Sequence, residues 1–109
     1  MAAAERTLGA LGLCARARGL IFGTPMVCEA LAGRKKPRLV LAAADNAPAT
    51  DKRLTDRCAY YGVRLEKLSV TGAALAHAVG KNAHLAAVAV TDENLCRLVL
   101  GTMEENHNV

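Results

Sequence analysis

The chain has 109 residues, enough for a single domain that buries one hydrophobic core without a disulfide or a metal. Only 3% of its residues are aromatic and none is tryptophan, which argues against the RNA-binding modules that stack single-stranded bases on aromatic platforms. The formal net charge of +4 favours an anionic partner such as a nucleic acid.

The four cysteines form none of the paired spacings that zinc sites and redox motifs require. They are Cys14, Cys28, Cys58 and Cys96, and their apolar neighbours predict small buried side chains. Unpaired cysteines fit a reducing compartment, and the sequence shows neither a leader segment nor an apolar run of membrane-spanning length. We therefore expect a cytoplasmic protein with no metal site and no membrane partner.

The first third of the chain predicts a helix, a short strand and a second helix. The expected ranges are 2–17, 20–22 and 24–32. Gly23 separates the strand from the second helix, Thr24 is a favoured N-cap residue, and Pro25 suits the first helical position. The start of such a helix leaves backbone N–H groups pointing outward beside a partial positive charge, which suits a phosphate. An ordinary buried junction between a strand and a helix has the same pattern.

The remaining chain alternates strands and helices. The expected strands are 39–44, 63–68 and 85–90, and the expected helices are 50–61, 72–79 and one that begins after Thr91. Continuous apolar runs in 39–44 and 85–90 are typical of strands buried on both faces of a sheet. Thr91 is expected to cap the last helix, Leu98 to lie on its buried face, and a polar tail to begin after Gly101. This alternation predicts an α/β sandwich, a small sheet with helices on both faces.

No group of reactive side chains converges as in an enzyme. His77 and His84 are separated by a glycine-ended helix, and the carboxylates have expected roles as turn, cap or surface residues. The sequence contains no dinucleotide-binding glycine motif and no phosphate-binding loop. Gly80 and Lys81 match only the glycine and the lysine of a phosphate-binding loop. We expect no enzyme, and therefore no catalytic residue, no cofactor and no small-molecule substrate.

One edge of the expected sheet gathers candidate binding residues. In a parallel or mixed sheet, the turn at Gly23, the turn after Ala44 and residues 81–84 can lie on one surface. The amides of Gly23 and Thr24 would then hold a phosphate. The basic cluster after the second helix would add sequence-independent attraction that weakens with salt; its members are Arg34, Lys35 and Lys36. The same basic run is equally typical of a solvated turn.

Six segments of the chain, in order and at matching spacing, resemble one known family. They are LGLCARAR (11–18), LVLAA (39–43), KRLTDRC (52–58), YYGV (60–63), AVGK (78–81) and VAVTD (88–92). From Leu8 to Leu100 the sequence is similar to the kink-turn RNA-binding ribosomal-protein superfamily of the archaeal large-subunit L-seven-Ae type, and most similar to its small bacterial YlxQ-like members. The resemblance implies a single RNA-binding domain over residues 1–109, a three-layer α/β/α sandwich around a four-stranded mixed sheet, and no catalytic site.

The resemblance also implies where the RNA binds. The start of the second helix, with Gly23 and Thr24, would dock into the widened groove of a sharply bent duplex. Residues 81–85 match the family segment that packs on an extruded nucleotide, which assigns Ala83, His84 and Leu85 to that base and Lys81 to electrostatic attraction.

Several residues depart from the family's strongest RNA binders. Pro25 stands in place of an asparagine and removes one N–H donor, Met26 replaces a glutamate, and Glu29 occupies the position of a lysine and repels phosphate. Our first hypothesis is a monomeric, non-enzymatic, ribosome-associated protein that binds structured, kink-turn-like RNA, with ribosomal RNA as a candidate. The alternatives are a protein-interaction module that has lost kink-turn recognition, and the substrate-recognition part of an RNA-modifying enzyme.

Overall fold

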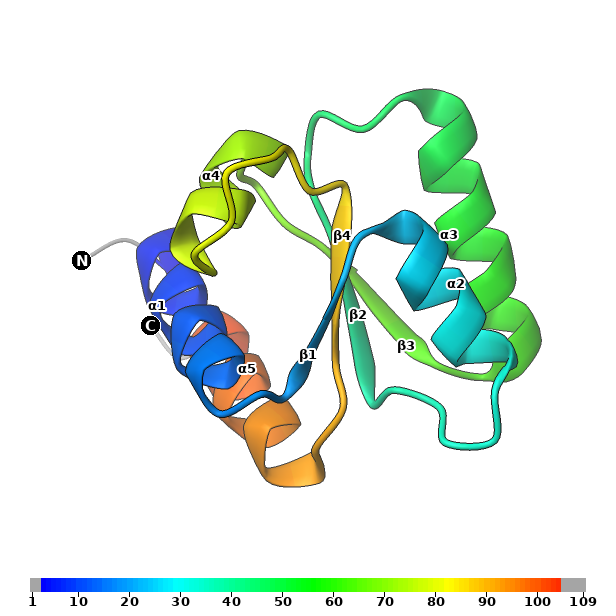
Figure 1. The fold of residues 1–109 in the computed structure, drawn as a ribbon, viewed down its shortest axis with the longest axis horizontal. Helices are drawn as coiled ribbons and strands as arrows, with labels where there is room; N and C mark the ends of the chain where they lie inside the picture. Colours follow the sequence, from blue (N-terminus) through cyan, green and yellow to red (C-terminus); the bar gives the residue numbers. More distant parts are fainter. Residues whose placement is uncertain (1–2, 105–109) are drawn as a thin grey trace.

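A four-stranded sheet lies between two layers of helices in the computed structural model (Figure 1). The structure describes residues 3–104. The helices are α1 (Ala3–Arg16), α2 (Thr24–Ala32), α3 (Pro48–Tyr61), α4 (Gly72–Ala78) and α5 (Glu93–Glu104), and the strands are β1 (Leu20–Phe22), β2 (Leu39–Ala42), β3 (Arg64–Lys67) and β4 (Ala87–Val90). Helices α1, α4 and α5 cover one face of the sheet, and α2 and α3 cover the other. The predicted three-layer α/β/α sandwich is confirmed.

The sheet is mixed and its strand order is β1-β4-β2-β3. β4 pairs antiparallel with β1 and with β2, whereas β2 and β3 run parallel. Every residue of β2 and β4 is buried, as expected for apolar strands at the centre of a covered sheet. β3 carries charged residues and lies at an edge, where such side chains also discourage pairing with another chain.

Alternation along the two central strands divides the core into two parts. Leu39 and Leu41 face the layer of α1, α4 and α5, and Val40 faces the layer of α2 and α3. All four cysteines are free and buried, as predicted. Burial raises the pKa of the Cys58 thiol to about 11, so this thiol stays protonated and behaves as a small apolar group.

The last helix departs from expectation in three ways. It begins at Glu93, and its cap is Asp92, whose Oδ2 accepts from the Leu95 amide at 3.0 Å. The Thr91 hydroxyl, expected to cap this helix, instead donates to the Gly19 carbonyl at 3.2 Å because the chain crosses beside the turn before β1. Leu98 is 43% exposed rather than buried, because it lies off the stripe that contains Val99.

The helix also continues beyond Gly101, where a polar tail was expected. The chain stays helical to Glu104. Met103 packs against the core, and the Thr102 hydroxyl lies 2.8 Å from that of Thr7 on α1. The remainder of the expected tail, residues 105–109, lies outside the described residues.

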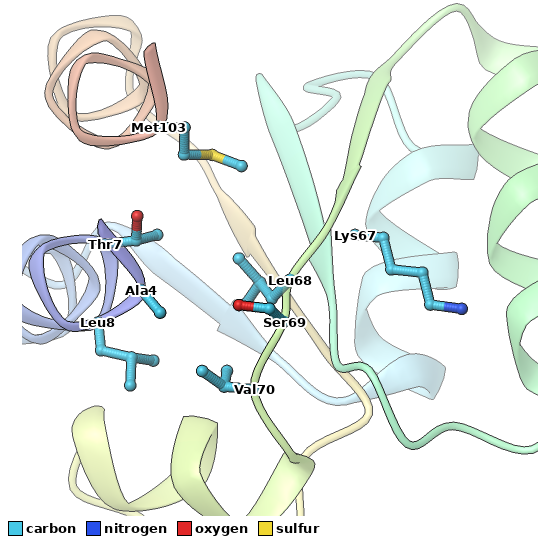
Figure 2. A pocket seen from close by; sticks show the side chains of 8 residues that line it. All are labelled: Ala4, Thr7, Leu8, Lys67, Leu68, Ser69, Val70 and Met103. Carbon is cyan, nitrogen blue, oxygen red and sulfur yellow. The ribbon is translucent and has the colours of Figure 1, made fainter. Parts of the chain in front are cut away.

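A small pocket opens between α1, α5 and the segment that follows β3 (Figure 2). Its volume is about 170 Å³ and its walls are mostly apolar, with contributions from Leu8, Leu68 and Met103. Lys67 points away from the cavity in Figure 2, and its ammonium group pairs with Asp51 at 2.7 Å. Lys67, the cationic side chain among the residues that line this pocket, is therefore directed toward Asp51 and not into the cavity.

Candidate nucleic-acid interface

Three loops meet at one end of the sheet, the upper end in Figure 1. The Gly23 amide donates to the Ala87 carbonyl at 2.9 Å, and the Asn46 side chain donates to the Ala86 carbonyl at 2.9 Å. We call the surface formed by residues 22–26, 45–46 and 81–84 the upper edge. The expectation that the turn at Gly23, the turn after Ala44 and residues 81–84 come together is confirmed.

The start of α2 differs from expectation by one residue. The N-cap is Gly23, whose φ of 86° favours glycine, so Thr24 is the first helical residue rather than the cap. The Thr24 hydroxyl oxygen is buried and has no hydrogen-bond partner among the described residues. The phosphate-binding potential of this turn therefore resides in its backbone.

Two backbone amides at this helix start are available to a ligand. The Val27 amide bonds to the Gly23 carbonyl at 2.9 Å, as in a regular helix. Pro25 has no N–H, and within the described part of the chain the amides of Thr24 and Met26 have no acceptor. They lie at the positive end of the α2 dipole, which favours an anion.

A lysine from another loop contacts the strand that leads into this helix start. Lys81 follows Gly80, which has a φ of 78° in the turn after α4. The Lys81 ammonium nitrogen is 4.4 Å from the centre of the Phe22 ring. Such a cation–π contact holds an ammonium group in place while leaving it accessible. The Phe22 ring packs on the face of the sheet that α1, α4 and α5 cover, so the contact places the Lys81 charge on that side of the turn at Gly23.

The next part of the same loop is ordered by Asp45. The His84 Nε2 atom lies 3.4 Å from Asp45 Oδ2, and Asp45 Oδ1 accepts from the Gly72 amide at 2.8 Å. The Gly72 amide, and to a smaller degree His84, lower the pKa of Asp45. The His84 side chain remains half exposed, and Ala83 is exposed.

Leu85 does not belong to this surface. Only 9% of the residue is exposed, and its side chain packs in the core under α1, α4 and α5. Its amide bonds to the Gly72 carbonyl at 3.1 Å. The assignment of Leu85 to an extruded base is therefore corrected: this residue anchors the loop, and Ala83 and His84 form its accessible part.

The basic cluster lies at the other end of the sheet, the lower end in Figure 1. The Arg38 amide bonds to the carbonyl of Val90, the last residue of β4, whereas Gly23 bonds to Ala87, the first. The nine residues of α2 also separate Gly23 from this cluster, a length of about 13 Å at a rise of 1.5 Å per residue. The structure therefore does not bring Arg34, Lys35 and Lys36 together with the start of α2, contrary to expectation.

The sequence of the chain matches the model of the Ribosomal protein L7Ae/L30e/S12e/Gadd45 family over residues 5–99. The chain belongs to this family. It is 33% identical over 94 residues to the RNA-binding protein YlxQ of Bacillus subtilis (strain 168), a match that covers 86% of this chain and 91% of that protein.

Solved structures support the family fold. A protein of unknown function from Bacillus halodurans superimposes with a TM-score of 0.81 at 28% identity, over 91% of this chain and 97% of that one. The Giardia lamblia 15.5kD RNA binding protein superimposes with a TM-score of 0.78 at 19% identity, over 94% and 86% of the two chains. At that identity the second likeness concerns the fold alone.

In this L7Ae-family chain, two contributors to the upper edge were not assigned from the sequence. The first is the set of side-chain contacts from the turn after Ala44, in which Asp45 lies against His84 and Asn46 donates to the Ala86 carbonyl. Met26, 53% exposed, is the second contributor, because it presents an apolar side chain next to the free amides. With Glu29 and Asp45 nearby, the upper edge carries no large excess of positive charge.

The described residues contain neither a cluster of metal ligands nor a helix able to cross a membrane. Between residues 3 and 104, no group of three histidine, cysteine, aspartate or glutamate side chains is arranged to hold a metal ion. No described helix combines the length and the apolar character needed to cross a bilayer.

Proposed function

We propose that this protein binds structured RNA through the upper edge and has no catalytic activity. The observation that carries the proposal is the pair of acceptor-free amides at Thr24 and Met26. The Lys81 ammonium group adds a positive charge over the ring of Phe22, the last residue of the strand that leads into this turn. Membership of the L7Ae family and the relative named as an RNA-binding protein support it. The RNA of this proposal is a kink-turn-like bent duplex, such as those of ribosomal RNA, and the protein binds it as a monomer in the cytoplasm.

Each part of the upper edge has a role in this proposal. Gly23 allows the backbone to approach the RNA closely, and the amides of Thr24 and Met26 donate to phosphate oxygens. Lys81 contributes charge. His84 and the small Ala83 form a surface on which an unstacked nucleotide can pack, since unpaired bases are recognised by stacking and edge contacts.

A second candidate function is a protein-interaction module on the same fold. It is favoured by the exposed Met26 and by Glu29, an exposed carboxylate on α2. An apolar side chain next to a carboxylate suits a protein surface better than a phosphate. The absence of an N–H on Pro25 points in the same direction.

Titration separates the two candidates. Binding of fluorescent kink-turn RNA and of a straight duplex is measured by anisotropy at two salt concentrations, with the wild type and with Lys81→Gln. We expect the wild type to prefer the bent RNA. Lys81→Gln is expected to lower the affinity for this RNA roughly tenfold, which corresponds to ~1.4 kcal/mol of binding free energy. Arg53→Gln, which removes one exposed charge from α3, is the control and is expected to have little effect. Equal, weak binding to both RNAs would favour the protein-interaction module.

A further inference from the structure

A groove at the lower end of the molecule carries a formal charge equal to the net positive charge of the whole chain. It has a volume of about 770 Å³. It is lined by Arg34, Lys35, Lys36, Pro37 and Arg38, by residues 61–64 at the junction of α3 and β3, and by Thr91 and Glu93. We call it the cationic groove. Its walls come from the segments between α2 and β2, between α3 and β3, and between β4 and α5, at the end of the sheet opposite the upper edge (Figure 1).

The charge of this groove is large for so small a protein. Its lining holds five cationic side chains and one carboxylate, a formal charge of +4. The whole chain also has a formal charge of +4, so all the other residues together are neutral. Glu66 pairs with Arg64 from outside the lining at 2.9 Å. A concentration of one sign of charge in a concave surface attracts a polyanion and raises its association rate.

The loop that forms one wall is held in place by its own contacts. The Lys36 ammonium group donates to the Gly33 carbonyl at 2.8 Å and lies 4.8 Å from the centre of the Tyr61 ring. Pro37 is buried, and the Arg38 amide bonds to the Val90 carbonyl at 2.7 Å. This ordering lowers the entropic cost of binding a ligand.

Two cations of this loop are available to a ligand. Arg34 and Lys35 are exposed, and in the described part of the chain neither has a hydrogen-bond or ion-pair partner. By contrast, Arg38 lies 3.8 Å from Glu93 and Lys36 is engaged with Tyr61. An arginine and a lysine next to each other on a fixed loop suit successive phosphates of a backbone.

We propose that the cationic groove is a second RNA-binding surface, which takes the phosphate backbone of an RNA segment without reading its sequence. Because the groove and the upper edge lie at opposite ends of the sheet, one copy of the protein then joins two RNA segments. The joining of two RNA segments rests on the proposed function of the upper edge, whereas RNA binding by the cationic groove does not depend on it. The lining favours RNA over an acidic protein because it is rich in cations, and its apolar side chains are limited to Pro37, Tyr61 and Val63.

The first experiment measures the groove by itself. A straight RNA duplex is titrated into the wild type and into Arg34→Gln/Lys35→Gln between about 50 and 200 mM salt. Each phosphate contact contributes ~0.9 to the log–log salt slope, so the double variant is expected to lower the slope by about 1.8. The matched control, Arg53→Gln/Arg57→Gln, removes two exposed charges from α3 outside the groove lining and is expected to leave the slope nearly unchanged. An unchanged slope in the groove variant, or equal loss in both variants, would overturn the proposal.

The second experiment measures the joining of two RNAs. Kink-turn RNA is immobilised, protein is added, and capture of a fluorescent straight duplex is recorded. We expect capture with the wild type, at least a fivefold loss with Arg34→Gln/Lys35→Gln, and unchanged binding of the immobilised RNA by that variant. Displacement of the protein by the duplex would mean one shared site and would overturn the two-ended arrangement. If the wild type does not bind kink-turn RNA at all, the proposed function is wrong. The salt slope of the first experiment still tests whether the cationic groove binds RNA.

Discussion

At the scale of single residues, Gly72 determines how the loop of residues 81–85 lies. A Cβ atom at this position would contact the His84 ring and come within 2.6 Å of the Leu85 carbonyl oxygen. Gly72→Ala is therefore expected to lower the free energy of unfolding by about 1–3 kcal/mol, the usual cost of overpacking, and to displace His84.

Urea unfolding checks this prediction, and α5 supplies a control. A Cβ atom at Gly101 meets no atom within 4 Å, and Gly101 is helical. Gly101→Ala is therefore expected to raise stability by up to ~1 kcal/mol. If Gly72→Ala proves as stable as the wild type, the close packing of His84 on α4 is incorrect.

Asp45, which contacts the same loop, is expected to make the stability of the fold depend on pH. The Gly72 amide and His84 hold its pKa below the ordinary value of 3.8 in the folded protein. Because the folded-state pKa is the lower one, the carboxylate stabilises the fold at pH values above 3.8, and this contribution is lost as the pH falls through the folded-state pKa. The wild type is expected to lose stability on acidification, and Asp45→Asn is expected to lose less.

Urea unfolding at neutral and acidic pH measures this difference. A second carboxyl group has the same direction of shift, since its hydrogen bond from Lys67 lowers the pKa of Asp51. Asp45→Asn should therefore reduce the acid dependence without abolishing it. Identical pH dependence in the variant and the wild type would contradict the role of Asp45.

At the scale of elements, the number of free amides at the start of α2 sets how well it can hold a phosphate. Pro25→Ala adds an N–H at the second helical position and leaves the register of α2 unchanged. If phosphate binds there, the additional hydrogen bond is expected to tighten kink-turn RNA binding by roughly fivefold, the effect of ~1 kcal/mol. Isothermal titration calorimetry measures the change, and an affinity equal to or below that of the wild type would contradict phosphate binding at this turn.

Most elements could be predicted because their sequence signals are local. The apolar runs that became β2 and β4 and the left-handed Gly62 after α3 needed no information from the rest of the chain. The caps of α2 and α5 were misassigned because distant groups decide them. Gly23 is fixed by the carbonyl of Ala87, and the hydroxyl of Thr91 is engaged by Gly19.

The candidate site shows the same division between local and distant information. The meeting of the turn at Gly23, the turn after Ala44 and residues 81–84 follows from the strand order and was expected from the sequence. The burial of Leu85 could not be read from its loop, because it depends on packing against α1 and α4. The position of the basic cluster was foreseeable, since a helix of nine residues carries the chain to the opposite end of the sheet.

At the scale of the whole molecule, the two ends of the sheet differ in charge and in shape. The upper edge offers directed amides, one lysine and a histidine, which suit recognition of a particular backbone geometry. The cationic groove offers a high density of charge, which suits attraction without sequence preference. In the proposed function, the upper edge would supply the specificity for RNA and the cationic groove the electrostatic affinity.

The central claim is that RNA binds at the upper edge, and an NMR titration of the ¹⁵N-labelled protein with kink-turn RNA tests it most directly. At a salt concentration that suppresses non-specific contacts, we predict the largest amide shifts at Gly23, Thr24 and Met26 and in residues 81–84. Shifts confined to other surfaces, or no shifts with RNA in excess, would contradict the claim.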